Sequence, residues 1–446
     1  HSIAASTFHK LGLNIISQVD GIMPKITQIS LRNFVKEQLL LNMQSDTYLN
    51  LLSSYLLYNR VAAKSEFEFK TQKEYDEYLK LNPPTTVNNE AVKSYGEMDI
   101  ANFLMQNGIQ YIYEYPYEID TRTSEHGQYH PDFYLPDYQI YIEYFGINRK
   151  GEVPSYFKAT NGMSATEAYR ASMEWKRSTH REHKTTMIEC YAYEKLEGNL
   201  LNSLKEKLEA ASVVLAPKSS KELWAQVAAK SDSLLDGIIE LFETLINLIK
   251  SNGYDIATVH KLNYAGSNTQ TNNTLLSLLE PIFNAYCNYL ADHREIDFND
   301  MINLASEYVR QGKYINPYKY VIVDEYQDIS KARFTLLDCL RKSRDYELFC
   351  VGDDWQSIYR FAGSDIGFIL NFAKYWDATE VSKIETTYRF SQKLIEISGG
   401  FIMQNPVQIK KSIRGKSEDF GFPLGEISGY TDKYAIEFMS KKLRKH

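Results

Sequence analysis

The sequence predicts an α/β protein in which a parallel-sheet core is interrupted by a helical insertion that carries a second, smaller α/β domain. From about residue 312 onward, strand and helix patterns alternate, which is typical of a parallel sheet. Leu and Ile recur at helical spacing through 197–310, so that segment should be helical. Residues 89–195 follow the order α-β-β-β-α-β and should form a compact unit with its own core.

These patterns divide the chain into five segments. A mostly helical part of the core is expected first, and it should end near the adjacent prolines Pro83 and Pro84, because such pairs mark a boundary. The expected segments are 1–88 (N-terminal core and helical part), 89–196 (inserted α/β domain), 197–310 (helical subdomain), 311–385 (core with acidic motifs) and 386–446 (start of a second core domain).

Two apolar runs in the core each end in acidic residues. Residues 320–323 end in Asp324 and Glu325, and residues 348–351 end in Gly-Asp-Asp-Trp-Gln. Nucleotide-hydrolysing α/β folds use such strand ends to place a Mg²⁺ ligand and a water-orienting base beside a phosphate. An isolated Asp-Glu after a strand is more often a solvated turn, so the hypothesis depends on the pair of runs.

Several motifs carry a family resemblance. DEYQD at 324–328, VGDDWQSIYRF at 351–361 and TTYRF at 386–390 resemble, in that order, motifs II, III and IV of the UvrD/Rep family of DNA helicases, most closely its helicase IV type. STFHKLGL at 6–13 resembles the family's Thr-Phe-His motif. The resemblance implies a RecA-like core, ATP and Mg²⁺ as cofactors, and 3′-to-5′ movement on single-stranded or forked DNA.

The resemblance also implies roles at the nucleotide. Asp324 should hold Mg²⁺, and Glu325 should orient the attacking water. Gln356 and Arg389 should reach the γ-phosphate, where a planar cation matches the developing charge. Tyr388 should stack near the adenine.

Five further residues are expected at the DNA strand. Thr7, Phe8 and His9 match the strand-contact motif of the family, although a capping Thr and a packed Phe would be the ordinary structural interpretation of this triplet. Tyr359 and Phe361 should lie near single-stranded DNA, because aromatic faces stack on bases.

No G-x-x-x-x-G-K-[ST] loop, which binds the β- and γ-phosphates of nucleotides, occurs in the 446 residues. In the family this loop precedes the Thr-Phe-His motif, and motifs V and VI follow beyond motif IV. We therefore expect a fragment of a longer protein, and we expect this polypeptide by itself not to hydrolyse ATP efficiently.

The inserted domain contains a second acidic pair. Asp132 begins one expected strand and Glu143 lies within the next, with a turn between them. On such a hairpin both carboxylates can converge on one divalent cation, Mg²⁺ or Mn²⁺, that activates water for attack on a phosphodiester. The insert therefore predicts a metal-dependent centre.

This arrangement resembles the PD-(D/E)XK nuclease fold. The resemblance adds Glu97, on the preceding helix, as a third metal ligand. The family's Lys normally stands two residues after the second acid, where this chain has Phe145. Lys176 on the following helix is the expected substitute, with Lys150 in reserve, and its ammonium would stabilise charge developing on the phosphate.

Composition sets the remaining expectations. The net charge of −7 argues against a uniformly basic DNA-binding protein, but residues 149–184 hold eight Lys or Arg against four Asp or Glu, which suits a DNA backbone. The four scattered cysteines and the lack of a long apolar run indicate a cytoplasmic, nucleoid-associated protein with no membrane contact. Protein partners are not predicted.

Two other functions stay open from the sequence. One is an ATP-independent nuclease that uses the motor part as a scaffold. The other is a DNA-binding or assembly module without catalytic activity in either centre. Helicase action in repair, or in defence against foreign DNA, is the leading interpretation.

Overall fold

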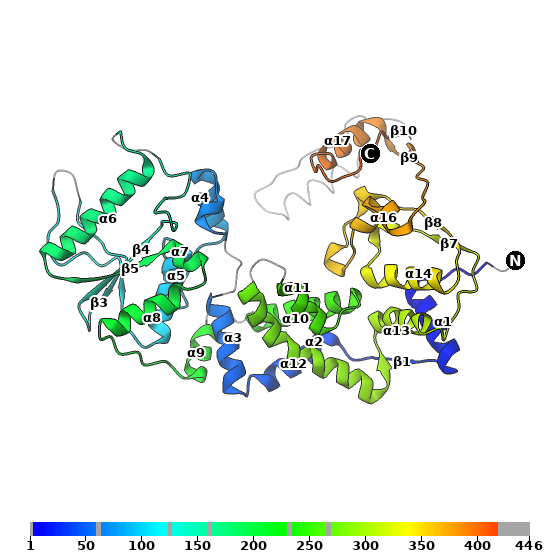
Figure 1. The fold of residues 1–446 in the computed structure, drawn as a ribbon, viewed down its shortest axis with the longest axis horizontal. Helices are drawn as coiled ribbons and strands as arrows, with labels where there is room; N and C mark the ends of the chain where they lie inside the picture. The colour runs from blue at the N-terminus through cyan, green and yellow to red at the C-terminus, as the bar shows by residue number, and fades with distance from the viewer. Residues whose placement is uncertain are drawn as a thin grey trace, which may run out of the picture. The chain divides into compact units, whose positions relative to one another are not determined.

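A computed structural model gives the structure of the protein (Figure 1). It describes residues 3–58, 64–123, 127–158, 162–229, 234–264 and 269–417. The part of the expected 386–446 domain beyond residue 417 therefore lies outside the described residues. The chain divides into two compact units, one made of His1–Gln28, Leu245–Asp255 and Leu290–His446, and the other of Ile29–Thr244 and Ile256–Tyr289.

The first unit contains the expected parallel strands. β7 (Tyr320–Val323) and β8 (Glu347–Cys350) pair in parallel, with Val323 opposite Cys350. Helices α1 (Phe8–Asp20), α13 (Phe298–Arg310) and α14 (Lys331–Ser343) supply most of the buried apolar side chains that pack beside this pair. The expected strand at 320–323 is confirmed, and the second strand begins one residue earlier than expected.

The remaining elements of the first unit are short. Two further parallel pairs are formed by β1 (Lys25–Ile26) with β6 (Glu295–Ile296), and by β9 (Thr386–Ser391) with β10 (Arg414–Ser417). The other helices are η2 (Tyr326–Asp328), η3 (Asp354–Gln356), η4 (Arg360–Ala362), α15 (Gly367–Leu370), α16 (Phe372–Trp376) and α17 (Gln392–Ile402).

The second unit combines a helical part with the inserted domain. The helical part contains α2 (Leu31–Asn42), α3 (Asp46–Tyr58), α9 (Ser220–Ala228), α11 (Ile256–Tyr264), and most of α10 (Leu234–Ser251) and α12 (Thr269–His293). Phe34 packs edge-on against Tyr286 at 5.5 Å between ring centroids, and the Tyr48 hydroxyl donates to the Leu278 carbonyl at 2.8 Å. The helical periodicity therefore predicted the right class of structure.

The inserted domain has the predicted order of elements. Its mixed sheet runs β2-β3-β4-β5, with β4 and β5 parallel and the other pairs antiparallel. The elements are α5 (Tyr95–Gln106), β2 (Ile112–Tyr113), β3 (Phe133–Leu135), β4 (Ile140–Phe145), α6 (Ala165–Glu182), β5 (Thr186–Tyr191), α7 (Ala192–Leu196) and α8 (Leu200–Ala210). Two short elements, η1 (Glu66–Glu68) and α4 (Gln72–Leu81), precede them in the chain.

Local sequence determines where α5 begins and ends. Ser94 caps the helix by accepting a hydrogen bond from the Glu97 N–H at 3.1 Å, which satisfies a free helix donor. The helix ends before Gly108, whose φ of +69° suits glycine. The apolar core also includes Leu208 and Val213, so it continues past the boundary expected at residue 196.

A substitution at Leu104 measures how much this core contributes to stability. Its side chain is fully buried between α5 and the sheet, so Leu104→Ala should lower the free energy of unfolding by about 2–5 kcal/mol through lost burial and a residual cavity. Leu81→Ala is a matched control because Leu81 is 82% exposed. Denaturant unfolding followed by circular dichroism measures both variants, and equal effects would contradict this description of the core.

Within the described residues, no helix is both long and apolar enough to cross a membrane. All four cysteines are free thiols, and Cys190 and Cys339 are buried.

Candidate functional site

The acidic residues after β7 emerge beside the loop after β8. The Val351 N–H donates to the Val323 carbonyl at 2.8 Å, and the Tyr326 N–H donates to the Val351 carbonyl at 2.8 Å. Asp324 and Glu325 are both exposed at this edge. Glu325 has a φ of +51°, a left-handed conformation that is costly for a side chain of this kind and is common at functional sites.

Gln327 joins the two loops, and the sequence interpretation had given it no role. Its Nε2 donates to Glu325 Oε2 at 2.7 Å, and its Oε1 accepts from the Asp353 N–H at 2.9 Å. Gln327 is 1% exposed. A Cβ at Gly352 would lie 2.9 Å from Gln327 Oε1, so only glycine permits this close approach. Gln327 is the glutamine of the DEYQD motif, but its role depends on its burial and its contacts, which the sequence does not show.

Gln356 lies in the same loop, at the end of η3. Its Nε2 donates to Asp353 Oδ2 at 2.7 Å, and the side chain is exposed. Tyr359 and Phe361 follow, with 47% and 71% exposure and ring centroids 6.0 Å apart. Exposed aromatic rings of this kind can stack on bases, so their predicted DNA contact is compatible with their placement.

Lys411 attaches this loop to the segment after α17. It forms ion pairs with Asp353 and, at 2.5 Å, with Asp354, which is 1% exposed. The Trp355 indole N–H donates to the Ile409 carbonyl at 3.0 Å. The sequence interpretation missed this attachment, because Lys411 and Asp353 lie 58 residues apart.

Tyr388 and Arg389 lie on β9, and both are exposed. The Lys416 ammonium lies 5.6 Å from the centre of the Tyr388 ring. The Arg389 N–H donates to Thr387 Oγ1 at 3.2 Å, which is a local contact. Their roles at adenine and γ-phosphate therefore stay predictions.

The Thr-Phe-His triplet starts α1. Thr7 caps this helix by accepting from the Lys10 N–H at 3.2 Å, and Phe8 packs against the buried core. His9 lies edge-on to Phe298 at 5.7 Å, and burial is the main cause that lowers the pKa of His9. These structural roles account for all three residues, and DNA contact stays a prediction for them.

The inserted domain brings four predicted residues close together. Glu97 projects from α5, Asp132 directly precedes β3, and Glu143 lies in β4. Lys176 on α6 places its Nζ 2.5 Å from Glu143 Oε2. Glu97 and Glu143 are only 6% and 1% exposed, so this is a buried carboxylate cluster with one compensating ammonium.

Hydrogen bonds fix each carboxylate. Tyr129 donates its hydroxyl to Glu143 Oε1 at 2.6 Å. The Tyr144 N–H donates to Asp132 Oδ2 at 2.7 Å. Glu97 accepts from the hydroxyls of Tyr113, at 2.5 Å, and of Ser94, at 2.9 Å. The two tyrosine donors did not stand out in the sequence, because tyrosine is abundant throughout the chain.

The electrostatics of the cluster disfavour negative charge. Burial, and next the charge of Asp132, raises the pKa of Glu97 to about 7 and that of Glu143 to about 8. Burial also raises the pKa of Asp132. Like charges in a desolvated site cannot all ionise without a compensating cation, so the donor set suits a divalent ion.

The described residues contain no group of three His, Cys, Asp or Glu side chains arranged to hold a metal. Mg²⁺ is often bound through one or two carboxylates, with water completing its shell. Asp132 and Glu143 fit that smaller set. Glu97, already bound by Tyr113 and Ser94, stays a prediction as a third ligand.

Lys176, rather than Lys150, lies in the buried carboxylate cluster. Its Nζ lies 5.5 Å from the Phe145 ring centre and 5.6 Å from that of Tyr129. Phe145 is 1% exposed, so a buried apolar ring stands at the position of the expected Lys. Lys150 is exposed in the loop after β4.

Comparison with known proteins agrees with the motifs of the first unit. A family model described as the UvrD/REP helicase N-terminal domain matches residues 1–377. DNA helicase IV of Escherichia coli is 39% identical over 139 residues, which are 31% of this chain and 20% of that protein. ATP-dependent DNA helicase PcrA of Staphylococcus aureus is 29% identical over 174 residues, 38% of this chain and 24% of that protein.

The matched stretches thus span a quarter or less of the length of these relatives. The family model, in contrast, covers most of the chain, including the Thr-Phe-His, DEYQD and VGDDWQSIYRF motifs. The chain therefore belongs to the family of UvrD/REP helicase N-terminal domains.

Proposed function

We propose that this chain is part of an ATP-dependent DNA helicase or translocase of the helicase IV type that carries a metal-dependent nuclease insert. Family membership supports the motor. The single observation that carries the nuclease assignment is the buried grouping of Asp132 and Glu143 with Lys176. The protein would act at the nucleoid in the cytoplasm, in repair or in defence against foreign DNA.

In the motor, Asp324 would hold the Mg²⁺ of ATP, and Glu325 would orient the attacking water. Gln327 holds the Glu325 carboxylate at 2.7 Å, so it limits the positions that this base can take. Gln356 and Arg389 would contact the γ-phosphate, and Mg²⁺ would neutralise charge on the phosphates. Gln356 and Lys411 both bind Asp353. A movement of Gln356 when the γ-phosphate is released would therefore be transmitted through Asp353 to the segment after α17.

The insert would cut DNA with its own residues and one divalent cation. The cation, Mg²⁺ or Mn²⁺, would supply an activated water. Asp132 and Glu143 would hold it, with Glu97 beside them. Lys176, which is 24% exposed, would place its ammonium against charge developing on the phosphate. Tyr129 and the pairing of β3 with β4 orient Glu143.

Strand displacement tests the motor proposal. The full-length protein with ATP and Mg²⁺ should unwind a duplex that carries a 3′ single-stranded tail and leave a 5′-tailed duplex intact. A forked substrate serves as the positive control for loading. Unwinding of the 5′-tailed duplex alone would overturn the proposed direction, and no ATP-dependent unwinding of any substrate would overturn the helicase assignment.

One observation favours a second candidate, in which the insert binds DNA without cutting it. Both oxygens of Glu143 already accept hydrogen bonds, from Tyr129 and from Lys176. In that case the ammonium replaces the metal as the compensating charge. Metal-dependent cleavage separates the two candidates, because the second predicts DNA binding without cleavage under any divalent cation.

Lys176→Ala should reduce cleavage about 100- to 1,000-fold, the range for losing one charged stabiliser of a transition state. Metal binding should persist, since the carboxylates remain. Lys150→Ala is the matched control, because Lys150 is exposed on the same domain. Cleavage on labelled DNA measures both variants. An unchanged rate in Lys176→Ala, with a loss in Lys150→Ala, would transfer the role to Lys150.

Stabilisation of the insert by a divalent cation should increase with pH. The pKa of Glu143 is raised from 4.5 to about 8 in the fold. Protonated Glu143 therefore contributes its full stabilisation to the metal-free fold at pH values below its ordinary pKa of 4.5, and this contribution is lost as the pH rises through about 8. A cation requires ionised ligands and should restore the loss. Thermal melting with and without Mn²⁺ should show a larger gain at alkaline than at acidic pH. Glu143→Gln should abolish the gain, and a pH-independent gain would contradict this assignment.

A further inference from the structure

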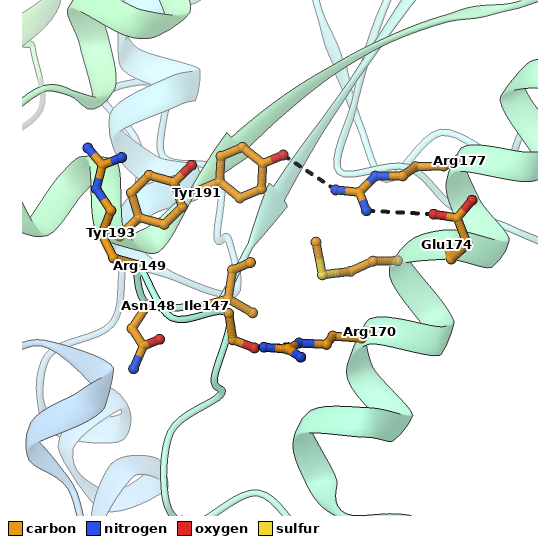
Figure 2. A pocket seen from close by; sticks show the side chains of 10 residues that line it. Ile147, Asn148, Arg149, Arg170, Glu174, Arg177, Tyr191 and Tyr193 are labelled. Atoms are coloured by element: carbon orange, nitrogen blue, oxygen red, sulfur yellow. Dashed lines mark hydrogen bonds and ion pairs between the residues drawn. The ribbon is translucent and has the colours of Figure 1, made fainter.

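A hollow of about 500 Å³ lies in the inserted domain, lined entirely by residues between Ile147 and Tyr193. Met173 and Ile147, both buried, form its apolar floor. Three arginines and one glutamate, Glu174, line the sides, so the lining residues carry a formal charge of +2. Figure 2 shows two of these arginines entering from α6, opposite a pair of tyrosines.

The tyrosines form a stack with the third arginine. Tyr191 and Tyr193 have ring centroids 5.0 Å apart and planes 14° apart. The Arg149 guanidinium lies 4.7 Å from the centre of the Tyr193 ring and is held by two hydrogen bonds of 2.6 Å to Glu197. The Arg149 side chain remains 69% exposed, so its planar group presents an outward surface on which a base can stack.

Arg170 differs from the other two arginines in its partners. Its guanidinium donates to the carbonyls of Gly151, at 2.9 Å, and of Lys150, at 2.8 Å. These neutral acceptors orient the guanidinium without cancelling its charge. Gly151 has a φ of +74°, and a Cβ there would lie 2.6 Å from Arg170 Nη2. Glycine at 151 is therefore needed for both the turn and the close approach of this cation.

Arg177 connects the hollow to the carboxylate cluster. It is held by Glu189 at 2.8 and 2.6 Å. Its guanidinium lies 5.9 Å from the Phe145 ring centre, and Lys176 Nζ lies 5.5 Å from the same ring. The Phe145 ring is therefore a shared neighbour of a cation that lines the hollow and of the cation that pairs with Glu143.

We infer that this hollow binds one nucleotide of single-stranded DNA, with its phosphate at Arg170 and its base against the stack of Arg149, Tyr193 and Tyr191. Arginine is suited to phosphate through its planar donors, and stacking on aromatic rings tolerates any base. The inference rests on the proposed function in taking DNA as the polymer. It adds a strand-holding site beside the cleavage centre.

The test is binding of a fluorescein-labelled 12-nucleotide single strand by the full 446-residue chain in EDTA, which prevents cleavage. Arg170→Ala and Tyr193→Leu should each weaken binding about tenfold. Arg122→Ala and Tyr115→Leu are matched controls on the same domain. Arg122 is an exposed arginine paired with Asp120, and Tyr115 is an exposed tyrosine stacked on Tyr134. The controls should stay within twofold of the parent chain.

Photocrosslinking locates the site independently of strand contacts in the motor. A 12-mer containing 5-iododeoxyuridine should form adducts mapped to Tyr191 or Tyr193. If a leucine or alanine variant fails to fold, Tyr193→Phe should keep the affinity and Arg170→Gln should lose it. Unchanged affinity in folded variants, or adducts only outside the insert, would overturn the inference.

Competition arms define the ligand. Adducts of free 5-iododeoxyuridine monophosphate at Tyr191 or Tyr193, with none from the 12-mer, would overturn the strand assignment in favour of a free nucleotide. Equal binding of an RNA 12-mer at this site would overturn the assignment to DNA. If the binding and crosslinking tests fail but metal-dependent cleavage is intact, only the proposal of a strand-holding site is wrong. If the parent chain binds no DNA at all, the proposed function is wrong as well.

Discussion

Asp324→Ala should abolish ATP turnover in the full-length protein and leave DNA cleavage intact. Asp324 directly follows strand β7, at the edge where the loop after β8 also emerges. Removing a carboxylate that holds Mg²⁺ removes the ion that neutralises charge on the phosphates. A loss of at least about 1,000-fold is expected, comparable to removing a charged group that acts in the transition state.

DNA-stimulated phosphate release measures this loss. Asp338→Ala is the matched control, since Asp338 is an acidic residue of the same unit that pairs with Lys342 on α14. It should retain turnover. If Asp324→Ala keeps the parent rate, the assignment of the β7–β8 edge as the nucleotide site is wrong.

Glu143→Ala should abolish metal-dependent cleavage and leave ATP turnover unchanged. The change removes a proposed metal ligand and leaves Lys176 without its partner at 2.5 Å. Loss of a partner that only orients a metal ligand typically costs 10- to 100-fold, so loss of the ligand itself should reduce cleavage by more than about 100-fold.

A second variant separates chemistry from folding. Glu143→Gln keeps the shape and the hydrogen bond from Tyr129 but removes the charge. Glu206→Ala on α8, an exposed acid of the same domain, should cut at the parent rate. Cleavage that survives in folded Glu143→Gln would place the nuclease centre elsewhere, and lost ATP turnover would show that the variant disturbs more than the insert.

Much of the fold could be predicted because the informative patterns were local. The apolar run at 320–323 matches β7, and the α-β-β-β-α-β order expected for 89–195 is that of α5, β2, β3, β4, α6 and β5. Lys176 was expected to replace the missing strand lysine, and its ammonium lies beside Glu143. A helix brings residues at fixed spacing to one face. Packing of α6 against the sheet therefore places Lys176 beside Glu143.

Other features depended on the packed chain. Of the aromatic run at 109–119, only Ile112–Tyr113 forms a strand, β2. Glu114 has a φ of +50°, and Pro116 lacks a backbone donor, so the ladder ends there. The roles of Gln327 and Lys411 depend on contacts across 26 and 58 residues with Asp353, which no local pattern indicates.

Cleavage of labelled single- and double-stranded DNA by this chain with Mg²⁺ or Mn²⁺ and no ATP, next to the Glu143→Gln control, measures the proposed nuclease activity directly. The parent chain should cut DNA in a metal-dependent way, and the control should not. If the parent and control chains bind DNA but give no products with either cation, the insert is not a nuclease.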